Sequence, residues 1–136
     1  MGKLELVKTK KNVLIITDGS EKTAEMAAGI AAALGNCNVS LKSAPEFKGN
    51  DILPAEVFFI GCEKPEPDSF SYLSDLFGHI NLIGRPCGVF SSGSEKTVKY
   101  LAGLVKGSEA ALNTAGFLSG QGKDISQWAQ TVASGA

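Results

Sequence analysis

The residues best suited to hold a charged ligand lie in three short segments, each of which follows an apolar run. These segments are Thr17–Thr23, Gly61–Asp68 and Ser91–Thr97. The first is rich in small and hydroxyl residues, and it ends where a helix is expected to begin. Free backbone amides and the helix dipole make such a place suitable for a phosphate group, although any capped helix has a similar composition.

Strand-like and helix-like segments alternate along the chain, which predicts an α/β fold, a parallel sheet with helices on both faces. The continuous apolar run Asn12–Thr17 is typical of a central strand, whereas the alternation in Asn38–Lys42 indicates an edge strand. The connection Ser43–Pro54 has room for about one helical turn. Further strands are expected at Ala55–Gly61, Arg85–Ser91 and Leu112–Leu118, and helices at Ser20–Leu34, Asp68–Ile80, Ser94–Val105 and Lys123–Ala133.

Five strands in the order 2-1-3-4-5 form the doubly wound arrangement that fits this number of elements. In such a sheet, ligands bind outside the carboxyl ends of the strands, where the strand order reverses. The three segments above would therefore meet at one edge of the sheet. No linker divides the chain, so we expect residues 1–136 to form one domain.

One pentapeptide, Gly-Ser-Glu-Lys-Thr, occurs twice, as Gly19–Thr23 and as Gly93–Thr97. Both copies follow an expected strand and open an expected helix. We interpret them as a reused helix cap, in which Ser20 and Ser94 cap the two helices and the following glutamate favours the positive helix end.

Composition excludes several classes of protein. The formal net charge is −1, so no nucleic-acid partner is expected. The three cysteines form no Cys-x-x-Cys pair, which argues against a zinc site or a disulfide framework and favours the cytoplasm. Neither a signal peptide nor an apolar run long enough for a membrane span is evident. The oligomeric state stays open.

Known catalytic motifs are also missing. The chain has no Cys-x5-Arg loop after the first strand and no Gly-x-Gly-x-x-Gly. A phosphoacceptor domain of this topology would need an acid cluster by the first strand and an aspartate ending the third, but only Asp18 is present. We therefore expect an electron carrier or a binding domain rather than a catalyst with active-site residues of its own.

Four parts of the chain carry a resemblance to a known family. Asp18–Thr23 reads DGSEKT, and Gly84–Ser94 reads GRPCGVFSSGS. In these segments, in Asn50–Gly61 and in the closing helix with Trp128, the chain resembles the flavodoxin family, specifically its short-chain branch. The similarity covers nearly the whole chain.

This resemblance implies an FMN cofactor, electron transfer and a redox partner protein. It places the phosphate on the first loop and the flavin ring at the two later loops. The implied cofactor-binding residues are Thr17, Asp18, Gly19, Ser20, Lys22, Thr23, Gly61, Cys62, Glu63, Ser91, Ser92 and Gly93.

The chain departs from the family at the cofactor. Asp18 stands where the family has a hydroxyl residue, and its carboxylate would repel a phosphate dianion by about 1 kcal/mol or more. Glu21 replaces a glycine, whereas Lys22 would partly offset the negative charge. The two later loops contain no aromatic residue to stack on a flavin. The alternative is therefore a flavodoxin-like binding or regulatory module that has lost the flavin.

Four other residues have structural interpretations. Cys62, at a strand end, is expected to be a small residue lining the cleft rather than a reactive thiol. Trp128 belongs to a helical stripe and should pack in the core. His79 is expected to interact with a helix C-terminus. Arg85 begins a strand opposite the functional edge and is expected to be structural.

Overall fold

The computed structural model describes residues 10–113, 115–120 and 124–135. Within them, six strands form one parallel sheet in the order β2-β1-β3-β4-β5, and β6 also pairs with β4. The predicted order of the strands is confirmed, and the predicted edge strand is β2. The strands are β1 (Asn12–Thr17), β2 (Asn38–Ser43), β3 (Val57–Cys62), β4 (Pro86–Ser91), β5 (Ala111–Leu112) and β6 (Phe117–Leu118).

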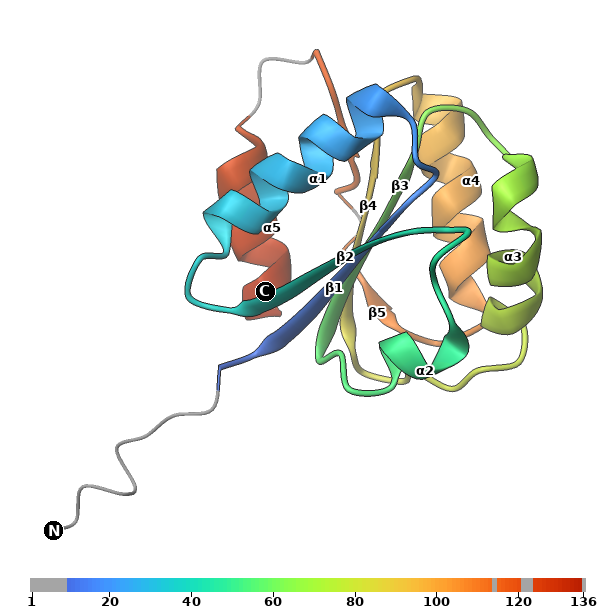
Figure 1. Cartoon of the computed structure of the whole chain (residues 1–136), viewed down its shortest axis with the longest axis horizontal. Helices are drawn as coiled ribbons and strands as arrows, with labels where there is room; N and C mark the ends of the chain where they lie inside the picture. Colours follow the sequence, from blue (N-terminus) through green and yellow to red (C-terminus); the bar gives the residue numbers. More distant parts are fainter. Residues whose placement is uncertain (1–9, 114, 121–123, 136) are drawn as a thin grey trace, which may run out of the picture.

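The helices cover both faces of the sheet, as Figure 1 shows. Helices α1 and α5 lie on one face, and α3 and α4 lie on the other. A single turn, α2, fills the connection after β2, where about one turn was expected. The helices are α1 (Glu21–Ala33), α2 (Gly49–Ile52), α3 (Ser71–Phe77, preceded by a 3-10 turn at Asp68–Phe70), α4 (Glu95–Lys106) and α5 (Ile125–Ser134).

Two apolar cores hold these layers together, one on each side of the sheet. Alternate residues of a strand point to opposite faces, so β1 sends Leu14 and Ile16 to one core and Val13 and Ile15 to the other. All of β3 is buried, as its apolar sequence predicts. This burial on both faces makes the center of the sheet a rigid support for the loops that follow its strands.

The prediction of one continuous fifth strand over Leu112–Leu118 is wrong. The segment forms two short strands, β5 and β6, which pair with successive parts of β4. Asn113 lies between them, and its side-chain oxygen accepts the Ala115 backbone N–H at 2.9 Å. Such an asparagine turn competes with strand pairing and interrupts the ladder. Residue 114 lies outside the described residues.

Three predicted helix boundaries also need comment. The helix expected at Asp68–Ile80 begins with the 3-10 turn and ends at Phe77, before Gly78. The last helix was expected to start at Lys123, which lies outside the described residues. In the described part its cap is Asp124, whose carboxylate accepts the Ser126 N–H at 2.9 Å.

Arg85 has the structural role predicted for it, at the amino end of β4. Its Nη1 lies 2.9, 3.0 and 2.9 Å from the carbonyl oxygens of Ile52, Leu53 and Ala55, to which it donates. These contacts tie α2 and the start of β3 to the edge of the sheet opposite the candidate site. Trp128 is half-buried and packs against the core, in line with the prediction, with its ring against Phe59, Phe90 and Phe117.

No helix in the described part of the chain has the length and apolarity needed to cross a membrane. The same residues contain no group of three or more histidine, cysteine, aspartate or glutamate side chains that could hold a metal ion.

Candidate functional site

The carboxyl ends of β1, β3 and β4 lie side by side in the sheet, so the three predicted segments meet at one edge (Figure 1). Thr17 ends β1 opposite Gly61 of β3, and Cys62 of β3 lies opposite Ser91 of β4. Parallel pairing with this register brings together the loops on which the predicted site residues lie. We call these loops the β1 loop (18–20), the β3 loop (63–67) and the β4 loop (92–94).

Asp18 links the β1 loop to the β3 loop. Its Oδ1 accepts the backbone N–H of Ser20 at 3.0 Å and lies 2.7 Å from the Ser20 hydroxyl. Its Oδ2 accepts the backbone N–H of Glu63 at 2.9 Å. Gly19, between Asp18 and Ser20, has a φ of +86°, a left-handed conformation that glycine adopts readily. The carboxylate is therefore satisfied by donors of its own protein.

Three hydroxyl groups link the β1 loop to the β4 loop. The Ser20 hydroxyl lies 2.7 Å from the Thr23 hydroxyl, which in turn lies 3.2 Å from the Ser92 hydroxyl. Thr23 is fully buried. The Thr17 hydroxyl accepts the Gly19 N–H at 3.2 Å and so shapes the same turn. These contacts place Thr17, Ser20, Thr23 and Ser92 around one small polar center.

The two pentapeptides differ at the helix that each opens. Ser94 caps α4 as predicted, because its hydroxyl oxygen accepts the Thr97 N–H at 3.4 Å. The prediction that Ser20 caps α1 is wrong: it stands at the cap position but makes no side-chain capping hydrogen bond. Its hydroxyl faces Asp18 and Thr23 instead. The first-turn amides of α1 are therefore left without a serine cap.

The β3 and β4 loops touch through Glu63 and Gly93. A Cβ added at Gly93 would overlap the Glu63 carbonyl oxygen, so only glycine allows this approach. The same carbonyl accepts the Thr97 hydroxyl of α4 at 3.3 Å. The Gly93 N–H donates to the Ser91 hydroxyl oxygen at 2.9 Å. The Glu63 residue is thus held by the β1 loop at its amide and by the start of α4 at its carbonyl.

Cys62 does not line an open cleft, contrary to the prediction. Its side chain is buried, and its thiol donates to the Lys64 carbonyl oxygen at 3.2 Å. Burial, and then the negative charge of Asp18, raise the pKa of the Cys62 thiol to about 12. Burial also raises the pKa of Cys87 well above its ordinary value. Both thiols are held in the protonated, unreactive form near neutral pH.

We expect one of the three thiols to react with a disulfide reagent in the native protein at pH 8, and all three to react in denaturant. Cys37 is the partly exposed thiol, whereas Cys62 and Cys87 are buried. Folding raises the pKa values of the Cys62 and Cys87 thiols, so the unfolded chain loses these protons at a lower pH than the folded protein. The free energy of unfolding should therefore fall as pH rises from 9 toward 12. Rapid reaction of two or more native thiols would contradict this burial.

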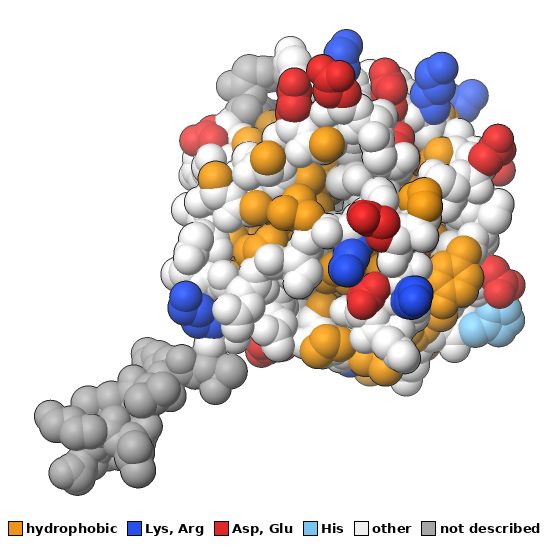
Figure 2. Space-filling model, in the orientation of Figure 1, with side chains coloured by type: hydrophobic (Ala, Val, Ile, Leu, Met, Phe, Trp, Pro, Cys, Tyr) orange, Lys and Arg blue, Asp and Glu red, His pale blue; other side chains and the backbone are white. Residues whose placement is uncertain are grey.

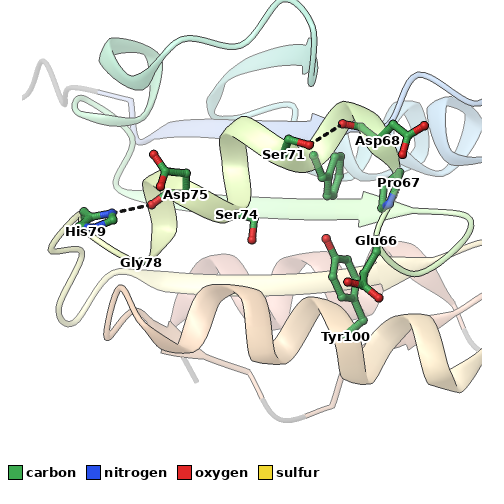
Figure 3. A pocket seen from close by; sticks show the side chains of 10 residues that line it. Glu66, Pro67, Asp68, Ser71, Ser74, Asp75, Gly78, His79 and Tyr100 are labelled. Atoms are coloured by element: carbon green, nitrogen blue, oxygen red, sulfur yellow. Dashed lines mark hydrogen bonds between the residues drawn. The ribbon is translucent and has the colours of Figure 1, made fainter.

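Tyr100 is a residue near the site that the sequence reasoning did not single out. It extends from α4 into a groove of about 580 Å³ between α3 and α4, beside Glu66 (Figure 3). Burial, and then the charges of Cys62 and Glu66, raise the pKa of Tyr100 to about 12. Its phenol therefore stays protonated. Tyr100 lies inside a helix and not in one of the loops where the sequence predicted a site. Its place near the site follows only from the packing of α4 beside the β3 loop.

A second hollow borders the polar center at Ser92. It has a volume of about 520 Å³, and its polar wall consists of Lys22, Glu25, Ser92 and Ser119. Met26, Phe117 and Ile125 contribute its apolar wall. Charged side chains of both signs crowd the neighbouring rim, where α1 and α4 begin (Figure 2). The hollow therefore combines an apolar wall with a polar wall that carries one side chain of each charge.

Comparison with solved structures shows the fold of the chain. A flavodoxin from Streptococcus pneumoniae TIGR4 superimposes with a TM-score of 0.77 at 19% identity, over 92% of this chain and 99% of the other. A short-chain flavodoxin associated with a bacterial microcompartment gives 0.75 at 15% identity, over 92% and 95%. A Fusobacterium nucleatum flavodoxin variant bound to flavin mononucleotide gives 0.63 at 11% identity, over 93% and 94%.

Neither a family model nor a curated protein sequence matches the chain. At these identities the likeness concerns the fold, which is flavodoxin-like over nearly the whole chain.

Proposed function

We propose that this flavodoxin-like protein binds a flavin at the carboxyl edge of its sheet and transfers electrons to a partner protein. The observation that carries the proposal is the uncapped start of α1, beside the hydroxyl groups of Ser20, Thr23 and Ser92. Helix amides without a partner attract phosphate, and hydroxyl groups supply further donors. The flavodoxin-like fold supports the proposal of a ligand at the same edge of the sheet.

The phosphate end of FMN fits the hydrogen-bond donors at this edge of the sheet. The first-turn amides of α1, with the hydroxyl group of Ser20, would hold the phosphate, and Lys22 would add a positive charge. The buried Thr23 hydroxyl would position the Ser20 hydroxyl beneath it. The backbone of Gly61–Glu63 and Ser91–Gly93 would contact the ring. When bound, the flavin supplies the redox chemistry, and the protein's residues hold and orient it.

Asp18 favours a second function, a flavin-free binding module. Its carboxylate places a negative charge in the loop that would hold the phosphate. The β3 and β4 loops contain no aromatic side chain to stack on the ring. We therefore expect the purified protein to carry little FMN, with a weaker affinity than a flavodoxin that has a hydroxyl residue in place of Asp18.

Thr23→Ala should weaken FMN binding by about 1 kcal/mol, roughly fivefold, because the hydrogen bond that positions the Ser20 hydroxyl for the phosphate is lost. The measurement is quenching of FMN fluorescence on addition of protein. Thr131→Ala is the matched control, since the Thr131 hydroxyl on α5 is exposed and bonds only to the Gln127 carbonyl of its own helix. Equal affinity in Thr23→Ala and the wild type would argue against this placement of the phosphate.

The proposed function fails if the wild type neither quenches FMN fluorescence nor alters the visible absorption of FMN at any protein concentration reached. That result would favour the flavin-free module.

A further inference from the structure

Two identical pentapeptides, in one protein, begin two helices in different ways. At α4, Ser94 turns back onto the helix and accepts the Thr97 N–H. At α1, Ser20 turns away from the helix, and its N–H and hydroxyl both lie within hydrogen-bond distance of Asp18 Oδ1. Since the five residues are the same, the difference must come from their surroundings. Asp18 supplies an acceptor before the α1 copy, where Ser92 stands before the α4 copy.

The second oxygen of Asp18 reaches across to another loop. It accepts the Glu63 N–H at 2.9 Å, 45 residues away in sequence. On its other side, Glu63 is held by the Thr97 hydroxyl and lies close against Gly93. One carboxylate therefore connects the start of α1 to the β3 loop, and through Glu63 to the start of α4.

We propose that Asp18 is a positioning residue that organises this edge in two ways. One oxygen withdraws Ser20 from the cap of α1 and so keeps the first-turn amides open to an anion. The other oxygen fixes the β3 loop through the amide of Glu63. The same carboxylate that opens the amides also lowers affinity for a doubly charged phosphate. The part that concerns an anion rests on the proposed function, whereas the two hydrogen-bond roles belong to the protein without ligand.

Asp18→Asn separates these two roles. Its side-chain oxygen still accepts from Ser20, but its NH2 group offers the Glu63 N–H no acceptor. Asp18→Ala removes both roles, and it frees Ser20 to cap α1 as Ser94 caps α4.

The test is amide hydrogen exchange, measured by NMR on the full chain without ligand. In the wild type the Glu63 amide should be protected, and Asp18→Asn should speed its exchange by about tenfold. In Asp18→Ala, exchange at Glu63 should rise equally, and the Thr23 amide should exchange more slowly than in Asp18→Asn, because Ser20 then caps it.

Asp124→Asn is the matched control. Asp124 makes the same turn, with its Oδ1 accepting the N–H two residues later at 2.9 Å, but it caps α5. Its replacement should leave the Glu63 amide unchanged. An unprotected Glu63 amide in the wild type would overturn the bridge, even if no variant folds. Equal Thr23 exchange in the two Asp18 variants would overturn the effect on the cap. Neither result depends on whether FMN binds.

Discussion

Gly93→Ala should lower the free energy of unfolding by about 3 kcal/mol, the upper end of the usual cost of overpacking. The added Cβ would overlap the carbonyl oxygen of Glu63, which is backbone and cannot rotate away. Either the β3 loop or the start of α4 must move, and both are tied to central strands. Urea denaturation of the variant and the wild type measures the difference.

Gly103→Ala is the control for this prediction. Gly103 lies within α4, and an added Cβ there meets no atom within 4 Å. Alanine in a helix interior should stabilise the protein by about 1 kcal/mol relative to glycine. If Gly93→Ala is destabilised and Gly103→Ala is stabilised, the overlap with the Glu63 carbonyl, and not the loss of a glycine as such, causes the destabilisation. Wild-type stability of Gly93→Ala would mean that the β3 and β4 loops lie farther apart than the structure has them.

The sequence predicted the architecture well where burial determines local structure. The apolar runs that became β1, β3 and β4 are covered on both faces, so their composition indicates central parallel strands directly. The fifth strand was predicted wrongly because the asparagine turn that interrupts pairing between Leu112 and Phe117 leaves the apolar pattern of the segment intact.

The meeting of the three loops at one edge could also be predicted, since parallel strands bring their carboxyl ends together. The contacts within the site could not. Ser20 and Ser94 are followed by the same three residues. The sequence places Asp18 before the first copy and Ser92 before the second, but it does not show that the Asp18 carboxylate turns onto Ser20. The burial of Cys62 likewise depends on the path of the β3 loop over it, which the local sequence does not specify.

Asp18→Asn should raise the affinity for FMN about tenfold or more, because it removes the repulsion between a carboxylate and a phosphate dianion. Asparagine keeps the acceptor for Ser20, so the start of α1 should stay uncapped and open. Riboflavin has the same ring without the phosphate, and its affinity should not rise. Fluorescence-quenching titrations of both flavins, with the wild type, Asp18→Asn and Asp124→Asn, measure the ratio of the two affinities.

The dependence on salt and the comparison with riboflavin identify the cause of any change in FMN affinity. A repulsion between charges near the surface is screened, so the gain for FMN should shrink as ionic strength rises. Equal gains for FMN and riboflavin would mean that freeing the β3 loop from Asp18, rather than removing charge, improves binding. An unchanged FMN affinity would place the phosphate away from Asp18. If neither flavin binds any of the three proteins, the loops without aromatic side chains are the larger defect, and the flavin-free module is the better account of this edge.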